Sequence, residues 1–115
     1  MLRLFALALL VQAVAPVAPP TRMMPYVEVV RCAGLTQAAS ELEGGESTEG
    51  RRLFDAALYW SLAASQAALA AGRAPGEADT DQTRARILAV RELGSASVKA
   101  RSDLETCRRR TPDLG

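Results

Sequence analysis

The sequence contains no histidine, the side chain that most often serves as a general base or binds zinc in proteins. Every serine–histidine and cysteine–histidine catalytic arrangement is therefore excluded. Only two cysteines are present, Cys32 and Cys107, and their wide separation excludes a CxxC redox pair and a haem attachment motif. No glycine-rich phosphate loop follows a strand, because the pattern predicts no strand. We expect no catalytic residues, no cofactor and no metal.

The chain has little net charge, with 14 Lys and Arg against 13 Asp and Glu, and Lys99 is its single lysine. Arg3 lies in the N-terminal segment discussed next, and without it the rest of the chain is formally neutral. Nucleic-acid binding and attachment to an anionic membrane surface both need a cationic face. We therefore expect no nucleic-acid partner and no electrostatic attachment to a membrane.

The N-terminal residues have the three-part pattern of a secretory signal peptide. Arg3 supplies a positive charge, residues 4–11 are apolar, and small residues follow. We predict a signal peptide over residues 1–15, cleaved after Ala13 or Ala15, and a flexible leader over residues 16–24. Retention of the apolar segment as a membrane anchor is the alternative, although it is short for ~30 Å of hydrocarbon. The abundance of Ala and Arg is typical of bacteria with GC-rich DNA, so we expect a periplasmic or secreted protein without stable membrane insertion.

Residues 25–110 are predicted to form one helical domain, with a tail over residues 111–115. In the first helix, residues 26–42, apolar side chains recur every three or four positions, namely Cys32, Leu35, Ala39 and Leu42. Gly44 and Gly45 end this helix. The second helix spans residues 48–71, with Ser47 or Thr48 as its N-cap. Its predicted core face consists of small and apolar residues: Phe54, Ala57, Leu58, Ser61, Ser65, Ala68 and Leu69.

The third helix is predicted to begin at Asp79, an N-cap whose partner Gln82 follows three residues later. Its apolar positions continue without a phase shift through Gly94 to Cys107. The main prediction is therefore an all-α, three-helix bundle. A short first helix would pack near the open end of a long hairpin formed by the second and third helices. The alternative is four helices with a break at Gly94.

In an oxidising compartment, Cys32 and Cys107 are expected to form one disulfide. Closing this loop contributes roughly 4.5 kcal/mol to stability on the chain-entropy model. A disulfide requires Cα atoms within about 7 Å, and a plain up-down-up bundle places the two cysteines too far apart. Either the first helix lies obliquely across the hairpin, or it runs parallel to the second helix.

Two groups of residues are candidates for partner contact. Tyr59 and Trp60 are amphipathic aromatics of the kind that dominate binding hot spots, although burial in the core would also explain them. Arg108, Arg109 and Arg110 suit an acidic partner, although cations at a helix C-terminus are also favoured by the helix dipole.

These features lead to two hypotheses for function. The first is a non-enzymatic binding or structural protein that contacts another envelope protein or itself. The alternative is a periplasmic stress chaperone activated by acid, in which protonation of paired carboxylates exposes apolar surface.

Overall fold

The computed structural model describes residues 24–113, which form four helices and no strand. The helices are α1 (Tyr26–Glu43), α2 (Thr48–Ala70), α3 (Pro75–Gly94) and α4 (Val98–Arg110). The all-α class is confirmed. The predicted signal peptide and the predicted leader up to residue 23 lie outside the described residues.

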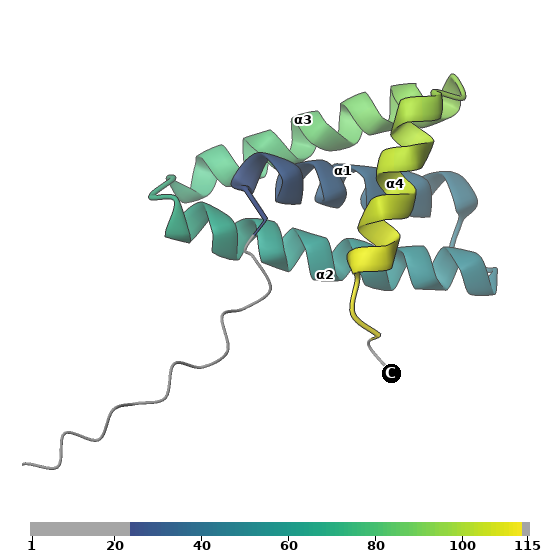
Figure 1. Ribbon diagram of the computed structural model, residues 1–115, viewed down its shortest axis with the longest axis horizontal. Helices are drawn as coiled ribbons and strands as arrows, with labels where there is room; N and C mark the ends of the chain where they lie inside the picture. Colours follow the sequence, from purple (N-terminus) through teal and green to yellow (C-terminus); the bar gives the residue numbers. More distant parts are fainter. Residues whose placement is uncertain (1–23, 114–115) are drawn as a thin grey trace, which may run out of the picture.

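Helix α1 is the central element of the fold. Figure 1 shows it between α2 and α3, with α4 crossing over it, and α1 contacts all three other helices. Its buried residues are therefore distributed around the helix rather than along one narrow stripe: Val29, Val30, Cys32, Ala33, Gly34, Leu35, Thr36, Ala38 and Ala39. A helix that is apolar around most of its circumference is typical of a buried position. The short first helix of the prediction is thus the core of the domain.

Helix α2 packs against α1 with a different face from the predicted one. Its buried residues are mostly small: Gly50, Leu53, Ala56, Ala57, Trp60, Ala64 and Ala68. Ala57 and Ala68 of the predicted core face are buried, whereas Phe54, Leu58 and Leu69 are more than half exposed. The prediction of the core face was therefore wrong for the large side chains. Alanine at the contact allows the backbones of α1 and α2 to approach closely.

The chain turns sharply after Gly94, so the four-helix alternative is the observed architecture. The N–H of Ser97 donates to the carbonyl of Glu92, and the N–H of Ala96 donates to that of Leu93, with distances of 3.0 and 3.2 Å. This pair of bonds is a Schellman motif, and Ala96 occupies its left-handed position with φ of 60°. Ser97 then caps α4 by accepting from the N–H of Ala100.

The start of α3 also differs from the prediction. The helix begins at Pro75, which suits the first helical position because its missing N–H is not needed there. Asp79 therefore lies within the helix and is not its N-cap. In contrast, the predicted cap of α2 is confirmed, because the Ser47 hydroxyl accepts from the N–H of Gly50 at 2.9 Å.

The predicted disulfide joins Cys32 of α1 to Cys107 of α4, with Cα atoms 5.5 Å apart. The break after Gly94 allows this distance, because the short α4 turns back across α1 instead of extending α3. Neither an oblique first helix nor a parallel connection is needed. The α1–α2 connection is a tight turn in which Gly44 has a φ of 82°.

Candidate functional site

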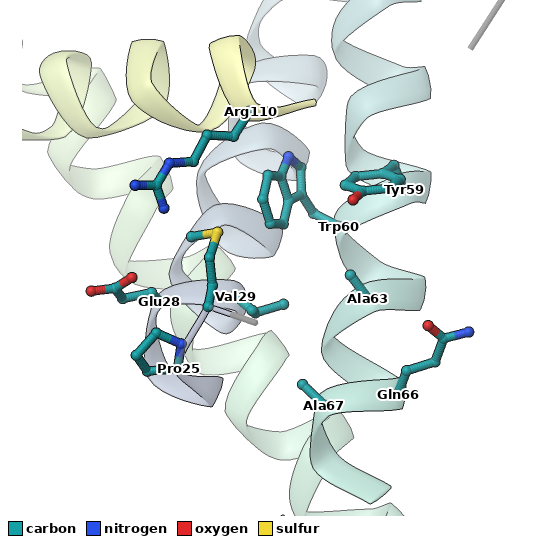
Figure 2. A pocket seen from close by; sticks show the side chains of 10 residues that line it. Pro25, Glu28, Val29, Tyr59, Trp60, Ala63, Gln66, Ala67 and Arg110 are labelled. Carbon is teal, nitrogen blue, oxygen red and sulfur yellow. The ribbon is translucent and has the colours of Figure 1, made fainter. Parts of the chain in front are cut away.

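An open groove is bounded by the start of α1, the middle of α2 and the end of α4. Its volume is about 930 Å³. Most of its lining is apolar or aromatic, and the residues are Met24, Pro25, Glu28, Val29, Tyr59, Trp60, Ala63, Gln66, Ala67 and Arg110. Figure 2 shows the α2 residues along one side and Pro25, Glu28 and Arg110 on the other.

Trp60 and Tyr59 lie next to one another in the wall of the groove. Their rings meet edge to face, with centroids 5.1 Å apart. Trp60 is only 3% exposed and belongs to the core cluster, whereas Tyr59 is half-buried. The Trp60 indole N–H donates to the Thr111 hydroxyl at 2.9 Å, and that hydroxyl donates to the Cys107 carbonyl at 2.8 Å. Trp60 therefore fixes the end of α4 to α2, and Tyr59 presents its ring to the groove.

The three consecutive arginines at the end of α4 lie in different surroundings. Arg110 lines the groove. Arg108 forms an ion pair with Glu49, at the start of α2, with an N–O distance of 2.5 Å. Arg109 is exposed and donates a hydrogen bond to Thr106. Of the predicted contact residues, the structure thus brings Tyr59, Trp60 and Arg110 to one site and leaves Arg108 and Arg109 outside it.

Further residues that line or support the groove were not identified from the sequence. Met24 was placed in the leader, yet it packs against the core cluster at the groove. Thr111 was placed in the tail, yet it links Trp60 to the end of α4. Glu28 and Gln66 resemble any other polar residue on an exposed helical position. They become part of a site only because α1, α2 and α4 meet here.

A charged network ties α1 to α3 and α4. The Arg31 guanidinium donates to both Glu92 carboxylate oxygens, at 2.7 and 3.0 Å, and to Asp103 at 3.2 Å. Lys99 also donates to Asp103, at 2.8 Å. The hydrogen bonds from Arg31 hold the pKa of Glu92 below its ordinary value, and those from Lys99 and Arg31 lower the pKa of Asp103. The carboxylates are accordingly stabilised in their ionised form.

A second cluster consists of Tyr26, Arg73 and Asp81. It lies at the end of the bundle that contains the start of α1 and the α2–α3 connection. The Tyr26 hydroxyl donates to Asp81 at 2.9 Å, and the Arg73 guanidinium lies 4.4 Å from the centre of the Tyr26 ring. Burial, with a contribution from Asp81, raises the pKa of the Tyr26 phenol. All three residues have partners within the domain, so this cluster is explained by stability.

Within residues 24–113, no group of three or more His, Cys, Asp or Glu side chains is arranged to hold a metal ion. In the same part of the chain, no helix is long and apolar enough to cross a membrane. No protein-family model, curated protein or solved structure matches the chain. The groove therefore has to be interpreted from its own residues.

Proposed function

We propose that the protein is a non-enzymatic binding protein of the bacterial cell envelope, exported by a signal peptide at residues 1–15. The observation that carries the proposal is the convergence of Tyr59, Trp60 and Arg110 on one apolar groove. Grooves of this kind, with few polar groups among apolar walls, are typical of binding sites. The disulfide supports export, because such bonds persist mainly in oxidising compartments.

The proposed ligand is an apolar segment of another envelope protein that carries an acidic side chain. Met24, Ala63 and Ala67 provide apolar surface, and the exposed part of Tyr59 provides an aromatic contact. Arg110 has no ion pair with any of residues 24–113, so its guanidinium is available for a carboxylate of the partner. A charge-assisted hydrogen bond there would orient the bound segment.

Photo-crosslinking in the intact envelope tests this proposal. A benzoylphenylalanine at Gln66, which is exposed and lines the groove, should capture a defined partner. The same residue placed at Thr83, exposed on α3 and away from the groove, is the matched control. Arg110→Glu should reduce capture from position 66. Absence of any capture at 66, or equal capture at 66 and 83, would overturn the proposal.

A second candidate function, an acid-activated chaperone, is favoured by the charged network around Arg31. Protonation of Glu92 and Asp103 removes their attraction to Arg31, while the disulfide still holds α4 to α1. Acid would thus loosen α3 from α1 and expose the alanine-rich core. The purified mature protein should then suppress aggregation of unfolded clients at low pH. Failure to do so at any pH from about 2 to neutral would exclude this function.

A further inference from the structure

A second surface, distinct from the groove, runs along the outer side of α2. We define the α2 outer stripe as Phe54, Leu58, Ser61, Leu62, Ser65 and Leu69. The side chains of Phe54, Leu58, Leu62 and Leu69 are 54%, 56%, 61% and 72% exposed. None of the six residues lines the groove. An exposed row of large apolar residues of this kind often marks a contact surface.

The spacing within the stripe is the same when read in either direction. Successive members are separated by 4, 3, 1, 3 and 4 positions. When two copies of α2 are antiparallel about a two-fold axis between Ser61 and Leu62, Phe54 therefore lies level with Leu69 of the other copy. In the same register, Leu58 lies level with Ser65, and Leu62 with Ser61. Leu58 and Leu62 thus each meet a serine, whereas Phe54 and Leu69 pair as two large side chains at the ends of the contact, and the same patch serves both copies.

The distribution of charge favours this antiparallel pairing over a parallel one. Residues 56–72 contain no Asp, Glu, Lys or Arg, so the centre of the contact is uncharged. Asp55 lies next to the stripe, near the N-terminal end of α2. Parallel helices would place the two Asp55 carboxylates side by side. Antiparallel helices place them about 20 Å apart, at 1.5 Å per residue, which is beyond the screening length in physiological salt.

The size of the stripe is sufficient for a weak dimer. At roughly 200 Å² for each large residue, the exposed fractions of these four residues give an apolar patch on the order of 500 Å² per copy. Two patches remove about 1,000 Å² from water, which is the lower limit for a specific protein interface. An interface of this size is typical of a weak or transient dimer rather than an obligate one.

We propose that the α2 outer stripe is the interface of an antiparallel, two-fold symmetric homodimer. This inference rests on the proposed function in one respect, namely that the protein is a binding protein. The groove stays open in both copies of the dimer. A dimer of this kind presents two grooves to the envelope partner.

Sedimentation of the mature, oxidised protein over a concentration series tests the dimer. The expected result is a monomer–dimer equilibrium that Leu62→Glu weakens roughly a hundredfold, because two carboxylates would be buried near the axis. Leu88→Glu, at a similarly exposed position on α3, is the matched control and should leave the equilibrium unchanged. Circular dichroism of both variants checks that the fold is retained. A monomer at every concentration, or equal effects of the two substitutions, would overturn the proposal.

Crosslinking between isotopically distinct copies tests the orientation. A benzoylphenylalanine at Phe54 should react with the other copy near Leu69. Reaction near residue 54 of the other copy, or outside α2, would refute the antiparallel register. Loss of the dimer with capture at position 66 retained would refute only this inference. A dimer without capture at position 66 would refute only the proposed role of the groove.

Discussion

Helices α1 and α3 approach one another closely at Gly34, and replacing this glycine with alanine should destabilise the protein strongly. A Cβ placed on Gly34 would lie 2.5 Å from the carbonyl carbon of Ala85 and 2.7 Å from its Cβ. The obstacle on α3 is backbone, so it cannot move away by a rotamer change. The helices would have to separate by about 1 Å to restore ordinary carbon–carbon contact.

The magnitude follows from two opposing effects. Overpacking a core contact costs about 1–3 kcal/mol, and a clash with helix backbone is at or above the upper end of that range. Alanine is a better helix former than glycine by about 1 kcal/mol, which offsets part of the cost. We expect a net loss of about 2 kcal/mol, or roughly 10 °C in Tm for a domain of this size.

Thermal and urea unfolding of the oxidised protein, followed by circular dichroism and Trp60 fluorescence, measures this effect. Gly94→Ala is the matched control, because Gly94 is also helical but nothing lies within 4 Å of the position that an alanine Cβ would take there. This control should be neutral or stabilising by up to about 1 kcal/mol. If Gly34→Ala were as stable as the wild type, the close packing of α1 on α3 would be refuted.

Three further substitutions test other parts of the fold. Replacing Cys32 and Cys107 with alanine should lower the free energy of unfolding by roughly 4.5 kcal/mol, and an unchanged Tm would contradict the role of the disulfide. Glu92→Gln should cost about 1–2 kcal/mol at neutral pH, where the hydrogen bonds to Arg31 are charge-assisted. The pKa of Glu92 is lowered by folding, so its contribution is complete above the ordinary pKa of a glutamate and is lost as pH falls through the folded pKa. Urea titrations should therefore show the variant and wild type converging in acid, and a difference independent of pH would contradict this account. Ala96→Gly should stabilise the protein by about 0.5–1 kcal/mol in the same assay, because it relieves a left-handed conformation, and destabilisation would argue against the Schellman motif.

The helices were predictable from the sequence, but their packing was only partly so. Apolar periodicity located α1 and α2 to within a residue or two at each end. The core face of α2 was misassigned because large apolar side chains are normally buried. Here the buried face is mainly alanine, which allows close contact with α1, and the large residues Phe54, Leu58 and Leu69 remain outside.

The turn after Gly94 was not clearly indicated by the sequence. The three-and-four pattern continues across the break, so periodicity alone predicted a single helix. The residue in the left-handed conformation is Ala96, where glycine would be the usual indication of a helix end. At the end of α2, Gly72 occupies that position, and the helix ends at Ala70, one residue before the predicted end.

The sequence identified individual residues of the candidate site, but it did not indicate that they lie together. Tyr59, Trp60 and Arg110 were each singled out for their side-chain chemistry. Their convergence depends on α4 crossing back over α1 toward α2, which requires the break after Gly94 and the disulfide together. The predicted pairing of Cys32 with Cys107 was confirmed because a chain with only two cysteines leaves a single choice.

The proposed role in the envelope requires export and the oxidised state of the two cysteines. The intact mass of the protein purified from its native envelope, with alkylation before and after reduction, tests both. We expect a chain that lacks its first 13 or 15 residues, with Cys32 and Cys107 unreactive until reductant is added. A full-length chain with two reactive thiols would contradict the compartment, the disulfide and the proposed role in the envelope.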